Sequence, residues 1–320
     1  MTDPEKLREL FAIDTHQYID GESEYRVDDI LFEDYIKTDG PKGGIMNAMY
    51  ENDYDTPSLI QAKILPLIEG AEPQNVIAQG QNGSGKTLAI ALTLLLRVDP
   101  QLDRLQGICL VPSREIAQQL YSLLVCLTSQ YPVRIGCCYP GGSQKTPMTE
   151  AQILVASPML FQRGENLDYN EVLTFVVDEA DGIIANKNHH RSLREMFSTK
   201  LRRPPCRVFF FSATFGERIE RKLLKYMPNP YRIDGDKLLM NSVNLYNITC
   251  EDADRDDIIA SVYNYLESAH TIIFADQRHE VTYLLEILQH RGIPVESIKG
   301  DLRPEERNAI MQRFREGNTR

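Results

Sequence analysis

The chain reads Val76-Ile77-Ala78-Gln79-Gly80-Gln81-Asn82-Gly83-Ser84-Gly85-Lys86-Thr87 in its first strongly patterned segment. Residues 75–79 predict a short buried strand, and the leucine- and alanine-rich run after the loop predicts a helix from Lys86 to Val98. The glycine-rich loop between them satisfies the pattern G-x-x-x-x-G-K-[ST] at every required position. A strand, such a loop and a helix, in this order, are typical of a phosphate-binding turn in a parallel α/β protein.

Short apolar runs alternate with helix-like segments after this loop. The further runs that predict strands are 107–111, 153–156, 175–177 and 208–211. A helix is predicted to begin near Ser113, directly after the first of these runs. Alternation of this kind predicts an α/β fold in which a parallel sheet carries helices on both faces.

A second alternating segment follows a break in the pattern between Pro228 and Ser242, where two prolines and Gly235 indicate a linker. Its predicted strands are 271–275 and 295–298, and its predicted helices are 280–289 and 304–315. The predicted organisation is a leader over 1–43, a first lobe over 44–235, a linker over 236–243 and the N-terminal part of a second lobe over 244–320.

The composition is that of a globular chain. Its 320 residues are enough for about two domains of roughly 150 residues each. The net charge of −11 means that binding to nucleic acid requires a local basic surface. None of the six cysteines forms a C-x-x-C pair or a zinc spacing, which favours free thiols in a reducing compartment. We find neither a signal-peptide pattern nor an apolar run of membrane-spanning length, so we expect a soluble intracellular protein.

The glycine loop predicts a nucleotide site. Gly83 and Gly85 allow backbone N–H groups on either side of Ser84 to turn towards phosphate oxygens. The N-terminus of the following helix adds favourable partial charge. Lys86 would reach the outer phosphates, and the Thr87 hydroxyl would bind a magnesium ion.

A cluster of carboxylates follows the predicted strand 175–177. Asp178, Glu179 and Asp181 would lie at the carboxyl edge of the sheet, where open α/β sheets bind ligands. Asp178 is the expected partner of magnesium, largely through water. Glu179 is the expected residue that positions and deprotonates an attacking water. The two motifs together predict ATP and Mg²⁺ as cofactors.

Two further pairs of residues are candidates around this site. Ser212 and Thr214 follow a predicted strand, and their hydroxyls would hydrogen-bond Asp181 and couple it to the state of the site. Gln61 offers a donor and an acceptor to the edge of an adenine, and Tyr54 would stack on its face. Taken alone, hydroxyl residues at a strand end are typical of an ordinary turn, and a lone tyrosine is typical of a core.

A third group suggests contacts with RNA. Arg114, at a helix N-terminus, would hold an RNA phosphate. Ser157-Pro158 occupies a similar strand end, and Gly141-Gly142 would allow close approach of a backbone. Each of these also fits a plain turn when it is read in isolation.

Together these residues resemble the DEAD-box ATP-dependent RNA helicases, from Phe32 to Arg320 and in the family's order. The matching segments are 54–61 for the Q motif, 80–87 for motif I, 112–115 for motif Ia, 178–181 for motif II, 212–214 for motif III and 272–274 for motif IV. Segments 78–83, 91–93, 97–99 and 211–215 resemble the subfamily that remodels messenger ribonucleoprotein at the nuclear pore.

The sequence also departs from the family pattern. Met159 replaces a family glycine, Lys299 replaces a common histidine, and Pro304 replaces a frequent glutamine. The sequence ends before the family's motifs V and VI, which would supply RNA contacts and charge-stabilising arginines. Because an arginine finger contributes about 10³ to 10⁵ in rate, we expect slow ATP turnover from this chain.

The resemblance implies two RecA-like lobes, the second incomplete, that act as an ATP-dependent RNA helicase in mRNA export. It implies single-stranded RNA or mRNA–protein complexes as partners, together with nuclear-pore and export factors. It further implies a monomer without membrane insertion, located in cytoplasm and nucleus at the nuclear pore, and a leader helix that inhibits by docking between the lobes.

Two other functions fit parts of the sequence. The chain is alternatively a module that binds nucleotide or a partner without efficient turnover. A DNA-directed P-loop motor is a third hypothesis, which Gln61 and the motif at 178–181 disfavour.

Overall fold

The computed structural model describes residues 31–37, 40, 42–69, 74–139, 147–159, 167–201, 206–227, 229–234, 247–251, 253–266 and 270–319. These residues belong to two units, one within 20–239 and one within 240–320. The predicted leader helix near Leu7 and the pair Gly141-Gly142 lie outside the described residues. No described helix has the length and apolarity that a membrane crossing requires.

A seven-stranded sheet organises the first unit. Its order is β3-β4-β2-β5-β6-β1-β7, and every neighbouring pair is parallel, which confirms the predicted RecA-like α/β class. The strands are β1 Val76–Gln79, β2 Gly107–Leu110, β3 Ile135–Cys138, β4 Ile153–Ala156, β5 Thr174–Val177, β6 Arg207–Ser212 and β7 Tyr231–Asp234.

The two outer strands are absent from the sequence prediction, and the linker predicted from Pro228 to Ser242 is wrong where it covers β7. Central strands are buried on both faces and therefore read as continuous apolar runs. In β7 only Ile233 is buried, and β3 contains Gly136, so neither carries that signal. β7 is nevertheless paired with β1 along its whole length.

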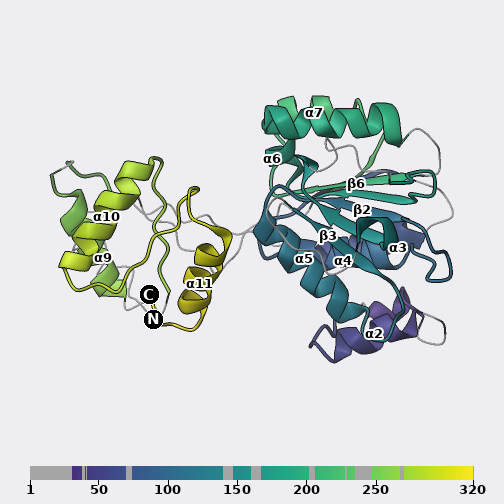
Figure 1. The fold of residues 1–320 in the computed structure, drawn as a ribbon, viewed down its shortest axis with the longest axis horizontal. Helices are drawn as coiled ribbons and strands as arrows, with labels where there is room; N and C mark the ends of the chain where they lie inside the picture. Colours follow the sequence, from purple (N-terminus) through teal and green to yellow (C-terminus); the bar gives the residue numbers. More distant parts are fainter. Residues whose placement is uncertain are drawn as a thin grey trace. The chain divides into compact units, whose positions relative to one another are not determined.

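The two faces of the sheet carry separate apolar cores because successive strand side chains point to opposite sides. Val76 and Ala78 of β1 belong to one core, and Ile77 between them belongs to the other. Figure 1 shows α2 to α5 on one side of the strands and α6 and α7 on the other. The helices are α2 Gly43–Tyr50, α3 Leu59–Glu69, α4 Lys86–Leu95, α5 Arg114–Leu127, α6 Ala180–Ala185, α7 Lys187–Glu195 and α8 Glu217–Leu223.

Helix α4 lies at the centre of the first core. All its residues from Leu88 to Leu95 are buried, and the one hydroxyl among them, on Thr93, donates to the Ala89 carbonyl over 2.7 Å. The helix ends at Leu95, short of the predicted Val98. Phe32 and Ile36 are also buried in this core, so the end of the predicted leader packs with the lobe.

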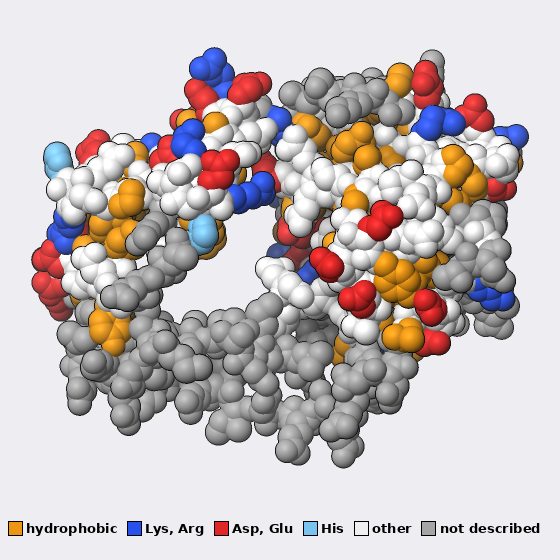
Figure 2. Space-filling view, turned by 90° about the horizontal axis from the view of Figure 1, so that it is seen from below, with side chains coloured by type: hydrophobic (Ala, Val, Ile, Leu, Met, Phe, Trp, Pro, Cys, Tyr) orange, Lys and Arg blue, Asp and Glu red, His pale blue; other side chains and the backbone are white. Residues whose placement is uncertain are grey.

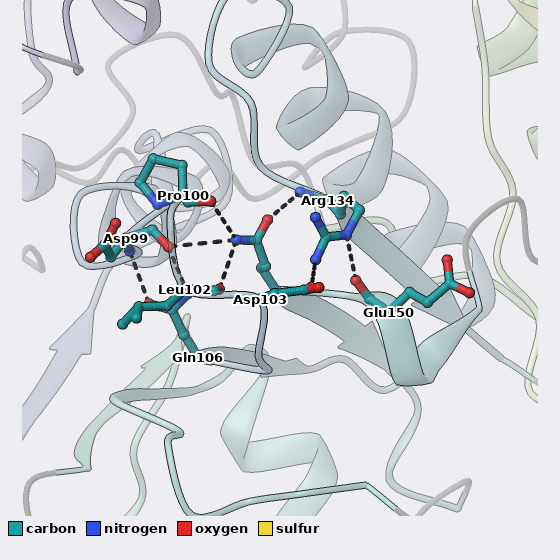
Figure 3. Close-up of polar contacts among 8 residues, drawn as sticks. Asp99, Pro100, Leu102, Asp103, Gln106, Arg134 and Glu150 are labelled. Carbon is teal, nitrogen blue, oxygen red and sulfur yellow. Dashed lines mark hydrogen bonds and ion pairs between the residues drawn. The ribbon is translucent and has the colours of Figure 1, made fainter.

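A polar network closes the amino ends of β2, β3 and β4, opposite the carboxyl edge (Figure 3). Gln106 accepts a hydrogen bond from the Asp99 N–H and donates to the Asp99 carbonyl. Gln152 accepts from the Arg134 N–H at 2.9 Å and donates to the carbonyls of residues 100 and 102. The Arg134 guanidinium forms an ion pair with Asp103. These bonds attach the loop before β2 to the sheet.

The second unit contains helices α9 Arg255–Leu266, α10 Arg278–His290 and α11 Pro304–Arg315. The two helices predicted there are confirmed, whereas the strands predicted at 271–275 and 295–298 are wrong, because neither segment joins a ladder with any described residue. Ile272 is 63% exposed and Phe274 is 91% exposed. A strand needs a hydrogen-bonded neighbour, and an apolar sequence alone does not supply one.

An apolar cavity of about 420 Å³ lies inside this second unit. It is lined by Leu284 and Leu288 of α10, by Phe314 of α11 and by residues of segments 271–275 and 295–298. Apolar side chains of the second unit are visible at the surface in Figure 2.

Candidate functional site

The strand order divides the carboxyl edge of the sheet into two halves. In the half formed by β5, β6 and β1, segments 178–181 and 80–87 directly follow β5 and β1, and segment 212–214 begins at the last residue of β6. The Gly80 N–H donates to the Ser212 carbonyl over 3.0 Å, which joins the glycine loop to the end of β6. The residues predicted for nucleotide and magnesium binding are therefore brought to one edge.

The glycine loop needs its glycines for two physical reasons. Gly83 and Gly85 have φ values of +83° and +90°, a region that side-chain-bearing residues rarely adopt. A Cβ on Gly85 would also lie 2.5 Å from Gln61 Nε2 and 2.6 Å from Ser58 Oγ. The loop therefore requires glycine both for its turn and for its contact with the residues before α3.

Lys86 begins α4 and turns back over the loop. Its Nζ donates to the carbonyls of Gly80 at 2.5 Å and Gln81 at 2.7 Å. Burial lowers the pKa of Lys86, and the nearby carboxylates of Asp178 and Glu179 oppose that shift. The ammonium group is therefore held against the carbonyls at the start of the glycine loop.

Gln61 of α3 is only 5% exposed and its amide is engaged with the protein. Its Nε2 donates to the Gly85 carbonyl over 3.0 Å, and its Oε1 accepts from the Ser58 N–H over 2.8 Å. Ser58 Oγ donates to the Ser84 carbonyl over 2.8 Å. Tyr54 is half-buried and packs against the core. Adenine recognition by Gln61 and Tyr54 remains a prediction, while the geometry links these segments to the glycine loop.

Ser58 is a loop-supporting residue that sequence reasoning missed. Its hydroxyl and N–H both serve the contact between α3 and the glycine loop. The signal available in the sequence was its position, three residues before Gln61, where small polar residues precede helices.

Asp178 and Glu179 stand directly after β5. Asp178 is 8% exposed, and its Oδ1 accepts the Glu179 N–H over 2.9 Å. Burial raises the pKa of Asp178 to about 6, and the N–H of Glu179 opposes the shift. Burial followed by the charge of Asp181 raises the pKa of Glu179. Clustered acids in a partly dry site thus hold protons more readily than acids in water do.

Glu179 also has a strained backbone. Its φ of +46° and ψ of 50° are left-handed, and it is one of three described non-glycine residues with positive φ. Such conformations cost of order 1–3 kcal/mol and cluster at functional sites. No sequence pattern indicates this strain.

Asp181 is in a different electrostatic situation. Burial raises its pKa, but hydrogen bonds from Thr214, Ser212 and the Gly182 N–H outweigh that effect, and the pKa falls below 3.8. Thr214 Oγ1 lies 2.7 Å from Asp181 Oδ2. The predicted association of Ser212 and Thr214 with Asp181 is thus present in the geometry.

The oxygen donors at this edge fit a magnesium ion. Thr87 lies half-buried on the first turn of α4. Asp178 has a carboxylate of which one oxygen accepts a hydrogen bond from the backbone N–H of Glu179. Among the described residues no group of three or more His, Cys, Asp or Glu side chains is arranged to hold a metal. Magnesium in nucleotide sites takes few protein ligands and keeps several waters, which suits this sparse set.

The other half of the carboxyl edge, formed by β3, β4 and β2, carries those residues predicted for RNA binding that the structure describes, Arg114, Ser157 and Pro158. Arg114 follows β2 at the start of α5, where Ser113 Oγ accepts the Ile116 N–H over 3.2 Å as a cap. Ser157 and Pro158 follow β4 and are buried, and the Ser157 N–H donates to the Cys138 carbonyl. Met159 is 43% exposed at the position that departs from the family pattern.

Known proteins and family models match most of this chain. The DEAD/DEAH box helicase family model matches residues 58–222, and the helicase conserved C-terminal domain model matches residues 254–320. The chain is 31% identical to ATP-dependent RNA helicase DBP5 of Yarrowia lipolytica, covering 86% of this chain and 57% of that protein. It is 30% identical to DBP5 of Saccharomyces cerevisiae, covering 86% of this chain and 58% of that protein.

Solved structures of the S. cerevisiae protein are similar as well. Dbp5 bound to RNA and ADP BeF3 matches with a TM-score of 0.75 and 28% identity over 86% of this chain and 72% of that chain. Dbp5 L327V bound to Nup159, Gle1 H337R, IP6 and ADP matches with a TM-score of 0.62 and 27% identity, covering 86% of this chain and 74% of that chain. The chain spans little more than half the length of these two curated relatives. With a family model that matches over half of its residues, the chain belongs to the DEAD/DEAH box helicase family.

Proposed function

We propose that this chain carries the ATP-binding lobe of an ATP-dependent RNA helicase that remodels RNA or RNA–protein complexes. The observation that carries the proposal is the convergence of Lys86, Asp178 and the Asp181–Thr214 pair on neighbouring strand ends. Each of these groups is typical of phosphoryl transfer, in which positioning and electrostatics dominate catalysis.

ATP would bind with its phosphates over the glycine loop. The N–H groups around Gly83 and Gly85 and the N-terminus of α4 would receive phosphate oxygens. The Lys86 ammonium group would exchange its two loop carbonyls for the outer phosphates. Gln61 and Tyr54 would border the adenine, with Gln61 holding the loop through Gly85 at the same time.

Magnesium would be held by Thr87 and, largely through water, by Asp178. When bound, the ion would neutralise charge on the β- and γ-phosphates. Burial raises the pKa of Asp178 to about 6, so this carboxylate is short of compensating positive charge in the free protein. A nearby cation would restore that balance.

Glu179 would act as the base that orients and deprotonates the attacking water. Its raised pKa brings its basicity closer to neutral pH, which favours proton acceptance in the transition state. The left-handed backbone at Glu179 places its side chain at the turn between β5 and α6. Water would attack the γ-phosphorus, and ADP and phosphate would leave.

RNA would bind along the β3-β4-β2 half of the same edge, with Arg114 and Ser157-Pro158 as its contacts. The sequence also predicts Gly141-Gly142 as an RNA contact, and that pair lies outside the described residues. The two halves belong to one sheet and are joined where β2 pairs with β5, so RNA and nucleotide would bind at neighbouring strand ends. The hydrogen bonds of Asp181 with Ser212 and Thr214 lie where the ends of β5 and β6 meet. These bonds would change with the nucleotide that is bound and so couple the nucleotide site to the rest of the sheet edge.

The relatives support a proposal for the cellular setting. Solved Dbp5 complexes contain RNA, Gle1 and Nup159. We propose that this protein acts as a monomer in mRNA export, with nuclear-pore and export factors as partners, and that it is present in cytoplasm and nucleus with a concentration at the pore.

The deciding experiment measures ATP binding and steady-state ATPase with Mg²⁺, with and without single-stranded RNA, and with DNA of the same sequence. RNA-specific stimulation supports the proposal. Tight ATP binding without RNA-stimulated hydrolysis would favour the nucleotide-binding module instead, and equal stimulation by DNA would favour a DNA-directed motor. Chelation of magnesium should remove both binding and hydrolysis.

A further inference from the structure

Arg114 lies against an aromatic ring from another strand. Its guanidinium carbon is 5.0 Å from the centre of the Tyr139 ring. Tyr139 directly follows β3, at the outer end of the sheet, while Arg114 begins α5 after β2. Since β4 lies between β3 and β2, the Arg114–Tyr139 contact spans the end of β4.

The Tyr139 ring covers the flat face of the Arg114 guanidinium group. The N–H groups at the edge of the guanidinium plane are not used by this contact. A cation over a ring is attracted by the ring quadrupole, whereas hydrogen bonds are donated in the guanidinium plane. The Nε and Nη1 groups of Arg114 are buried, and within the described structure they have no hydrogen-bond partner. Buried donors without acceptors are costly, so an anionic ligand that reached them would be favoured.

Tyr139 is itself held in place. Its hydroxyl accepts a hydrogen bond from Gln118 Nε2 over 2.9 Å, and its ring packs against the first core. Gln118 stands one helical turn after Arg114 on α5, so both residues meet the same ring from the same helix. The ring is therefore a fixed platform for the guanidinium.

We propose that Tyr139 is a positioning residue that holds the Arg114 guanidinium ready for an RNA phosphate. The inference rests on the proposed RNA site at the β3-β4-β2 edge, and it adds a residue that contributes through Arg114. The Gln118 hydrogen bond orients the ring, and the core beneath it prevents the ring from moving away.

The test measures the affinity of the full chain for fluorescein-labelled oligouridine at several salt concentrations, with saturating Mg²⁺ and a non-hydrolysable ATP analogue. The variants are Tyr139→Leu, Tyr139→Phe, Arg114→Ala and the double variant Tyr139→Leu/Arg114→Ala. Tyr121→Leu is the matched control, because Tyr121 is a partly buried tyrosine of the same core on α5. ATP affinity and urea unfolding are measured for every variant.

Tyr139→Leu should weaken RNA binding at least two- to fivefold, because a cation–π contact contributes about this much at exposed sites and more where it is partly buried, as here. Tyr139→Phe should restore most of the affinity because it keeps the ring. Arg114→Ala should make the slope of log affinity against log salt concentration shallower by roughly 0.7, which corresponds to the loss of one phosphate contact on a single strand. Adding Tyr139→Leu to Arg114→Ala should have no further effect, and ATP affinity should not change.

Two outcomes overturn the inference alone. In the first, Arg114→Ala weakens RNA binding but Tyr139→Leu matches the Tyr121→Leu control. In the second, Tyr139→Leu weakens binding equally in the Arg114→Ala background, which would show that the ring contacts RNA directly. If Arg114→Ala binds RNA like the parent, the proposed RNA site at Arg114 fails and this inference fails with it.

Discussion

Thr214 donates its hydroxyl hydrogen to Asp181 over 2.7 Å and so joins the segment after β6 to α6. This bond, together with those from Ser212 and Gly182, keeps the Asp181 carboxylate charged although burial opposes the charge. Three residues earlier, Asp178 has no comparable support and its pKa rises to about 6. Neighbouring acids in one motif therefore have opposite electrostatic properties, because only one of them faces hydroxyl donors from another strand.

Thr214→Val removes that donor while keeping the shape of the side chain. We expect ATP affinity to be retained and RNA stimulation of the ATPase to fall. The lowered pKa of Asp181 contributes stability above pH 3.8 that is lost as pH falls through the folded pKa. The variant should therefore be about 1 kcal/mol less stable in urea at neutral pH and match the parent in strong acid. Thr214→Ser is the control, and equal RNA stimulation in the Val variant would contradict the coupling role.

Asp178→Asn should stabilise the free protein. A pKa raised from 3.8 to about 6 means that the carboxyl's contribution to stability is complete below pH 3.8 and is lost as pH rises through about 6. The gain should therefore grow between about pH 3.8 and pH 6 and level off above about pH 6 at up to about 3 kcal/mol, since each pKa unit corresponds to about 1.4 kcal/mol. Urea unfolding across this pH range checks it. The control is Asp276→Asn, at an exposed residue, which should not change how the free energy of unfolding depends on pH. If Asp178→Asn stabilised the protein equally at every pH, the raised pKa of Asp178 would not be the cause.

Lys86→Ala should weaken nucleotide binding on the order of 100-fold, because charged hydrogen bonds to the phosphates are lost. Titration with a fluorescent ATP analogue measures the change. Lys187→Ala, at an exposed position on α7, should bind as the parent does. Equal affinity of the Lys86 variant and the parent would remove Lys86 from the phosphate site.

Glu179→Gln should bind ATP with nearly unchanged affinity but hydrolyse it about 10²- to 10⁴-fold more slowly, since the amide cannot accept the proton. Single-turnover hydrolysis with saturating RNA separates the two effects. Glu195→Gln on α7 is an exposed control. Parental hydrolysis by the Glu179 variant would exclude it as the base.

Gln152→Leu should destabilise the first unit by about 2–3 kcal/mol without changing ATP affinity. The change leaves the Arg134 N–H and the carbonyls of residues 100 and 102 without their side-chain partner. Thermal and urea unfolding measure the loss. The control is Gln101→Leu, at an exposed residue of the same loop, which should change the unfolding stability little. A large loss of ATP affinity in the Gln152 variant would contradict the prediction and show that the two ends of the sheet are coupled.

The central strands and the glycine loop were predictable because their signals are local. Residues 76–87 combine a buried run with glycines that the turn itself requires, and both properties are visible in the structure as burial and positive φ. The outer strands β3 and β7 were not predictable from apolar runs. Most of β7 is exposed, and Gly136 interrupts the apolar run of β3. The predicted strand at 271–275 shows the converse, an apolar run without a described partner.

The sequence by itself determined the family, the parallel α/β class and the identity of the phosphate and acid motifs, because these depend on residue types at short spacings. Only the tertiary structure decided that Ser58 supports the glycine loop, that Glu179 is strained, and that Arg114 rests on Tyr139. Those relationships join residues from different strands or depend on a backbone angle. They arise from the order in which the strands pair, and the site is built where their carboxyl ends meet.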